Sequence, residues 1–109
     1  MGRVGLGEFE HVVMLAIMRL EGDAYAPAIL GEIEACTGRA ASRGSIYITL
    51  DRLEEKGLIR SSLAVGPPAR GGRPRRYLEL TPAGLAALRE SREALLSLWS
   101  GLERRLRRA

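Results

Sequence analysis

The segment from Ser42 to Gly57 constrains the fold most strongly, because it predicts one helix with two different faces. Ile46, Leu50 and Leu53 recur at i, i+4 and i+7, which places them on one apolar stripe facing a core. A second helical stripe carries side chains that can donate hydrogen bonds, namely Ser45, Thr49, Arg52 and Lys56. Ser42 is suited to cap this helix and Gly57 to end it. The second stripe therefore predicts a face that meets a partner.

Two amphipathic segments precede this helix. Residues 8–20 and residues 25–37 both place apolar side chains at a helical period. The spacing in the second segment turns Ile33 and Cys36 inward, so we interpret Cys36 as a core residue. Gly38 ends this segment, and residues 39–41 then form a short turn that leads to Ser42. Two helices joined so closely, the second with a polar outer face, are typical of a helix-turn-helix.

A hairpin is predicted directly after the third helix. Residues 58–65 and 75–80 have the pattern of two strands, and the residues between them are rich in Gly and Pro. The tip of this hairpin carries basic side chains among small residues and prolines, namely Arg70, Arg73, Arg75 and Arg76. We interpret the hairpin as a wing that contacts DNA, in preference to a solvated loop.

The last predicted helix starts at Thr81-Pro82, a capping hydroxyl followed by a proline, and runs as a single helix to about Leu106. Its apolar stripe consists of Leu85, Leu88, Leu95, Trp99, Leu102 and Leu106. This is more apolar surface than a small core needs, so it predicts a homodimer interface. We therefore expect a mainly α (α+β) chain, with a winged helix-turn-helix DNA-binding domain over residues 1–80 and a C-terminal dimerisation helix over residues 81–109.

The charge balance favours a nucleic-acid partner. The 109 residues include 17 basic and 13 acidic side chains, for a formal net charge of +4, and Lys56 is the only lysine among the basic residues. Arginine presents a planar fork that matches phosphate oxygens and the edge of guanine. This composition therefore supports DNA binding.

Several other function classes are disfavoured by the sequence. A single Cys36 and a single His11 allow neither an internal disulfide nor a Cys/His metal cluster, and we expect no cofactor. No apolar run is long enough to cross a bilayer, so we expect a cytoplasmic protein that does not engage the membrane. We expect no enzyme either, because no nucleophile with a base partner and no phosphate-cradling glycine motif is present.

Two motifs at a fixed distance resemble one family. GSIYITLDRLEEKGLI, followed by RGGRPRRYLELTPAGLAAL, resembles the PadR family of transcriptional regulators. The chain departs from the family pattern at Ile48, where the family often has proline, and at Leu78, where it often has tyrosine. The resemblance implies the short branch of the family, in which the last helix forms a homodimer and a Trp on that helix binds apolar compounds in some members. Trp99 matches that residue, although burial in the dimer without a ligand is enough to explain a Trp at this position and is the interpretation we favour.

We expect a sequence-specific, homodimeric repressor that binds an inverted-repeat operator in double-stranded DNA and is relieved by a small apolar effector. The alternative is a winged-helix module that binds only proteins. The phosphate and minor-groove contacts are expected from Arg43, Tyr47, Lys56, Arg70, Arg73, Arg75, Arg76 and Tyr77. The base contacts are expected from Ser45, Thr49 and Arg52.

Overall fold

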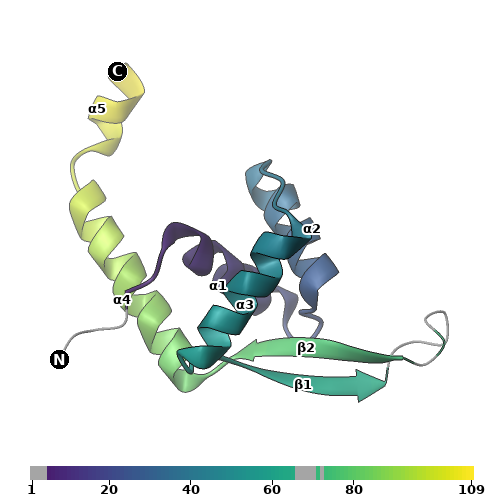
Figure 1. The fold of residues 1–109 in the computed structure, drawn as a ribbon. Coiled ribbons are helices and arrows are strands. Elements are labelled where there is room, and N and C mark those ends of the chain that lie inside the picture. The colour runs from purple at the N-terminus through teal and green to yellow at the C-terminus, as the bar shows by residue number, and fades with distance from the viewer. Residues whose placement is uncertain (1–4, 66–70, 72) are drawn as a thin grey trace.

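The computed structural model describes residues 5–65, 71 and 73–109 of the chain. Its elements follow the predicted order of three helices, a hairpin and a C-terminal helical segment (Figure 1). They are α1 (Glu8–Leu20), α2 (Ala26–Thr37), α3 (Arg43–Glu55), β1 (Ile59–Val65), β2 (Pro74–Leu80), α4 (Pro82–Trp99) and α5 (Glu103–Arg108). The predicted winged helix-turn-helix is confirmed.

Side chains that the sequence predicted as caps fix the starts of α3 and α4. The Ser45 backbone N–H donates to Ser42 Oγ at 3.0 Å, and the Gly84 N–H donates to Thr81 Oγ1 at 3.0 Å. Pro82 occupies the first turn of α4, where its missing N–H leaves no hydrogen bond unmade. Both helices therefore begin where their local sequence predicts.

One apolar core lies between the helices and the base of the hairpin. Met14 of α1, Ile29 of α2 and Leu50 of α3 are fully buried in it. The first half of α4 closes the core, because Gly84 packs so tightly that a Cβ atom there would lie 2.0 Å from the Leu58 carbonyl oxygen. Leu88 follows Gly84 by one helical turn and is 6% exposed. The prediction of Leu88 at a dimer interface is wrong, because it packs inside its own protomer.

The prediction that Cys36 faces the core is also wrong. Its side chain is exposed, and its thiol donates to Glu32 Oε2 at 3.5 Å. Ile29 and Ile33 are buried on the same helix, but every residue from 34 to 38 is exposed. The last turn of α2 extends past the elements that cover the earlier turns, so the apolar period continues where no core lies.

The hairpin pairs β1 with β2 in antiparallel register, from Ile59 opposite Leu80 to Val65 opposite Pro74. Ile59 and Leu78 are buried at its base, and the Leu78 N–H donates to the Ala24 carbonyl oxygen at 2.8 Å. Val65 at the far end is 82% exposed. The hairpin is therefore anchored at its base and projects from the core as a wing, as Figure 1 shows.

The C-terminal helix is not continuous, contrary to prediction. α4 ends at Trp99, Gly101 has a φ of 81°, and α5 starts at Glu103. Glycine adopts this left-handed conformation at little cost, so it ends the helix despite the apolar period that continues to Leu106. No helix in the described part of the chain is long and apolar enough to span a membrane.

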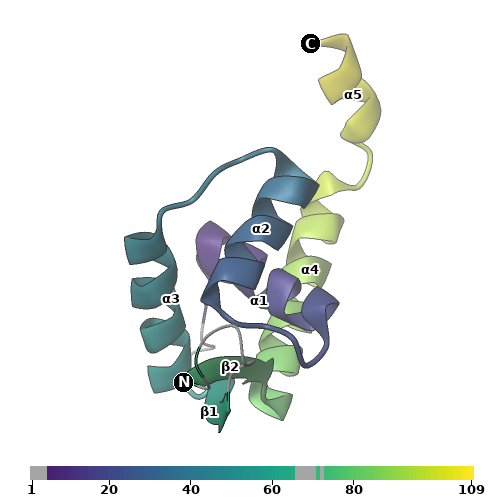
Figure 2. The same cartoon turned by 90° about the vertical axis from the view of Figure 1, so that its right-hand side faces the viewer.

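This segment also lengthens the molecule. The radius of gyration is 15.9 Å, whereas about 13 Å is typical of a compact domain of this length. The chain is therefore less compact than a globular domain of this length. Figure 2 shows α3 on one side of the molecule and α4 with α5 on the other, with α1 and α2 between them.

Candidate nucleic-acid interface

Helix α3 presents one long side to solvent and the other to the core. The buried side consists of Ile46, Thr49, Leu50 and Leu53. The exposed residues are Arg43, Gly44, Ser45, Tyr47, Ile48, Asp51, Arg52 and Glu55. Ser45 and Arg52 are thus exposed as predicted, together with Arg43 and Tyr47.

The prediction of Thr49 as a base-reading residue is wrong, because its side chain is 6% exposed. Thr49 follows Ile46 by three residues and precedes Leu53 by four, so it belongs to the buried stripe. The sequence placed Thr49 on the outer face because its hydroxyl can donate a hydrogen bond. The exposed face in fact lies further around the helix from the buried stripe.

Lys56 makes an internal ion pair, which contradicts the prediction that it faces outward toward DNA. Its Nζ donates to Glu10 Oε2 at 2.8 Å, and the Glu10 side chain is only 8% exposed. The Gly7 N–H donates to the other carboxylate oxygen at 2.8 Å. Burial raises the pKa of Glu10, but these hydrogen bonds and the charges of Lys56 and Arg52 outweigh it and hold that pKa below its ordinary value. Lys56 therefore ties the end of α3 to α1.

Arg75 and Arg76 lie within β2, the strand predicted over residues 75–80, and so do not belong to the tip of the wing, to which the sequence also assigned them. Arg76 donates to Glu54 Oε1 at 2.7 Å and to Asp51 Oδ1 at 3.3 Å, so it holds the wing against α3. The hydrogen bonds from Arg76 and from the Ser61 hydroxyl lower the pKa of Glu54. The local sequence does not indicate these ion pairs, because Arg76 follows Asp51 and Glu54 by more than 20 positions.

Arg75 holds the wing against α2 in the same way. Its guanidinium carbon lies 3.9 Å from the centre of the Tyr25 ring, a cation–π contact. Tyr25 also meets Tyr77 edge to face, with ring centres 5.9 Å apart. Arg75 and Tyr77, both predicted to contact DNA, therefore have internal packing partners. Tyr25 was absent from the predicted site, since nothing in the local sequence indicates its contact with β2.

A hollow of about 490 Å³ lies where α2, α3 and the wing meet. Arg43 and Tyr47 of α3 line it together with Arg73, which precedes β2 and is exposed. Predicted cationic residues from two separate elements are thus brought to one place, where they can receive a phosphate group. Arg70, the remaining predicted contact, lies outside the described residues.

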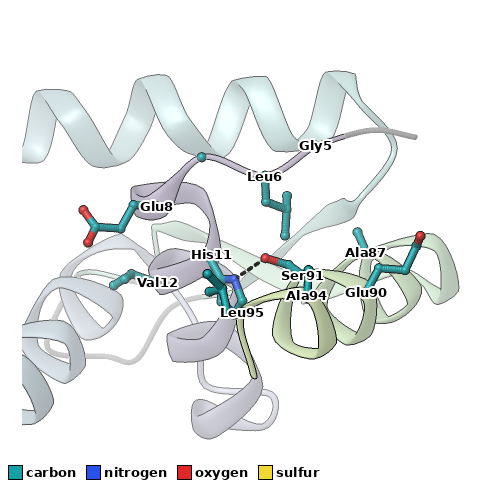
Figure 3. A pocket seen from close by; sticks show the side chains of 11 residues that line it. Gly5, Leu6, Glu8, His11, Val12, Ala87, Glu90, Ser91, Ala94 and Leu95 are labelled. Atoms are coloured by element: carbon teal, nitrogen blue, oxygen red, sulfur yellow. Dashed lines mark hydrogen bonds between the residues drawn. The ribbon is translucent and has the colours of Figure 1, made fainter. Parts of the chain in front are cut away.

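A second hollow, of about 700 Å³, lies between α1 and α4, on another part of the molecule. Leu6, Val12 and Leu95 give it apolar walls. His11 Nδ1 and Ser91 Oγ meet across it at 2.8 Å, as Figure 3 shows. The C-terminal helices also carry exposed large apolar side chains, namely Leu95, Leu96, Leu98, Trp99, Leu102 and Leu106. Of the predicted dimer residues, Leu85 is also exposed, at 38%.

Comparison with known proteins places the chain among transcriptional regulators. The model of the "Transcriptional regulator PadR-like family" matches residues 14–90. The transcriptional regulator Rv3488 of Mycobacterium tuberculosis is 48% identical over 61 residues, which cover 56% of this chain and 53% of that protein. The chain thus spans about half the length of this curated relative.

Solved structures show the same fold over nearly the whole chain. A PadR family regulator from Eggerthella lenta is 31% identical, with a TM-score of 0.69, and the match covers 91% of this chain and 86% of that one. A PadR-like regulator from Bacillus cereus is 22% identical, with a TM-score of 0.73 and 90% of each chain covered. Both matches therefore cover about nine tenths of the chain.

Proposed function

The chain belongs to the PadR-like family of transcriptional regulators, which is not a family of enzymes, and on this premise we propose that it represses transcription as a homodimer bound to an inverted-repeat operator. Membership implies DNA-binding regulation. Beyond this, we propose the inverted-repeat operator, the homodimer, the direction of regulation and a cytoplasmic location of the protein.

The observation that carries DNA binding is the meeting of α3 and the wing around one basic hollow. Arg43, Tyr47 and Arg73 line it from two elements, so one phosphate backbone can contact both. Ser45 and Arg52 are exposed on the next part of α3, where base edges of the major groove come within reach. Arg75, Arg76 and Tyr77 act in this scheme by holding the wing in place, because they already have partners on α2, α3 or β2.

Homodimer formation is supported by the apolar surface of the C-terminal helices. Leu95, Trp99 and Leu102 are each 40–50% exposed although they are large and apolar. A second copy is the occupant that fits, since a two-fold dimer lets each copy cover the apolar helices of the other. The two α3 helices would then meet half-sites about 34–36 Å apart, or a multiple of that spacing.

Control by a small apolar effector is part of the proposal and rests on Trp99. Trp99 is 40% exposed and follows Leu95, which lines the hollow between α1 and α4, by one helical turn. A ligand that binds one dimer arrangement better than another would change the separation of the α3 helices and release the operator. Addition of apolar aromatic compounds to the DNA complex, with Trp99 fluorescence as the readout, tests this part separately.

Footprinting on the DNA upstream of the protein's own gene tests the central proposal. We expect two protected half-sites related by an inverted repeat. Replacing Arg43 and Arg73 by Ala should weaken binding to all sequences and flatten the salt dependence by about one unit of slope per lost phosphate contact. A purified protein that protects no DNA at moderate salt would favour the protein-interaction module instead. A reporter gene behind the protected site then gives the direction of regulation.

A further inference from the structure

The exposed face of α3 has a different centre from the one that the sequence indicated. Ile46, Leu50 and Leu53 define the buried direction, and each residue turns the helix by about 100°. The residues opposite them are Gly44, Ile48, Asp51 and Glu55. Arg52 lies to one side of this line and Tyr47 to the other. Residues at this centre are the first to meet a surface that approaches α3 from outside.

Ile48 is the apolar residue at this centre, and its side chain is 60% exposed. Nothing in the core accounts for a β-branched apolar residue here, and polar straight-chain residues suit an exposed helix position better. Arg52 follows Ile48 by one helical turn, and Arg43 is exposed at the start of the helix. The partner that suits this surface is therefore polyanionic overall but offers an apolar group at its centre. The major groove of DNA does so at every thymine, through the C5 methyl group.

Gly44 stands one helical turn before Ile48, and the fold does not need a glycine there. It is not among the described glycines with positive φ, and an added Cβ would meet only Ser42 Oγ, at 3.9 Å. Alanine would suit a helix better at such a position. What glycine offers is a close approach of the backbone to another molecule.

The acidic residues of this face lie in the later half of α3. Asp51 accepts a hydrogen bond from Arg76 at 3.3 Å, and Glu55 is the last residue of the helix. Carboxylates repel phosphate groups, so this half of the helix is held away from the DNA backbone. The N-terminal half, with Gly44 and Ile48, is the part left to enter the groove, which is how recognition helices dock.

We propose that Gly44 and Ile48 form the base-reading centre of α3, with close backbone approach at Gly44 and contact of Ile48 with a thymine methyl group. This inference rests on the DNA binding proposed above and deepens it. It names the chemistry that determines specificity, which is apolar recognition of thymine, with Ser45 and Arg52 at the flank.

Single-methyl changes in the DNA test the contact directly. The probe is a synthetic duplex spanning the footprint, in which each thymine in turn is replaced by deoxyuridine. We expect one thymine per half-site whose replacement weakens wild-type binding about fourfold, as loss of one buried methyl group predicts. Ile48→Ala should bind the thymine and deoxyuridine duplexes equally. If Ile48→Ala remains as sensitive as the wild type, or if no thymine matters, the inference is wrong.

Gly44→Ala tests the close approach, with Gly31→Ala as its matched control. Gly31 is an exposed glycine in α2 that also has open space around it. Both variants should melt at or above the wild-type temperature, because alanine favours the helix. Only Gly44→Ala should weaken operator binding, by at least about tenfold, as its methyl group holds the helix away from the bases.

These outcomes separate the inference from the proposed function. If both glycine variants bind the operator about tenfold more weakly than the wild type, or if neither does, the close approach at Gly44 is wrong while DNA binding stands. A wild-type protein that protects no DNA overturns the proposed function, and this inference with it.

Discussion

The winged helix and the C-terminal segment differ in which of their side chains lack a partner within the protein. In the winged helix, charged groups that lie against the core have partners, as in Lys56 with Glu10 and Arg76 with Glu54. In the C-terminal segment, residues 95–109, large apolar groups such as Leu98 and Trp99 are exposed instead. The contrast teaches that the winged helix pairs the charged groups that lie against its core, whereas the C-terminal segment has an exposed apolar surface that a second copy would cover.

Breaking the apolar surface should give the largest effect. Leu95→Glu combined with Trp99→Glu should raise the dimer dissociation constant about 1,000-fold or more, because a two-fold interface loses each apolar contact twice. Analytical ultracentrifugation measures this, and circular dichroism should show the helices intact.

The matched control for this pair lies on the wing. Leu63 and Val65 are 73% and 82% exposed, so Leu63→Glu with Val65→Glu makes the same chemical change on another surface. This control should remain a dimer. Equal dissociation of both double variants, or of neither, would refute the assignment of the interface to the C-terminal segment.

Removing one partner of the Glu10–Lys56 pair should give the next largest effect. Lys56→Met leaves the nearly buried Glu10 carboxylate without its cation and should cost about 3 kcal/mol of unfolding free energy. Glu10→Gln should cost less, because the Lys56 side chain is 30% exposed and can turn to water. Urea unfolding measures both, and a larger loss for Glu10→Gln would contradict the ranking.

Acid should weaken the winged helix through the same pair. The pKa of Glu10 is lower in the folded protein than in the unfolded chain, so its contribution is complete at neutral pH and is lost as pH falls below about 4.3. The difference in unfolding free energy between wild type and Glu10→Gln should shrink on acidification from pH 7 to pH 3. A difference that stays constant over this range would contradict the assigned pKa direction.

Cys36→Ala should give the smallest effect. The thiol is exposed on the last turn of α2, so the change in unfolding free energy should stay within about 0.5 kcal/mol. A loss well above that value would restore the sequence-based interpretation of Cys36 as a core residue.

The sequence by itself determined the elements and their order as far as the start of α4. The caps Ser42 and Thr81 and the apolar periods are local signals, because hydrogen bonds and helical faces form between residues close in the chain. Arg43, Ser45, Tyr47 and Arg52 were also placed on an exposed surface correctly. Local pattern was enough wherever the deciding neighbour was a few residues away.

Only the tertiary structure decided which polar residues are free to meet a partner. Thr49 is covered by the core, while Lys56 and Arg76 are held by acidic residues 46 and 22 positions away in the chain. Burial and ion pairing depend on what other elements bring into contact, which no local period records. The same reason explains why Leu88 belongs to the core of its own protomer, whereas Trp99 on the same helix remains exposed.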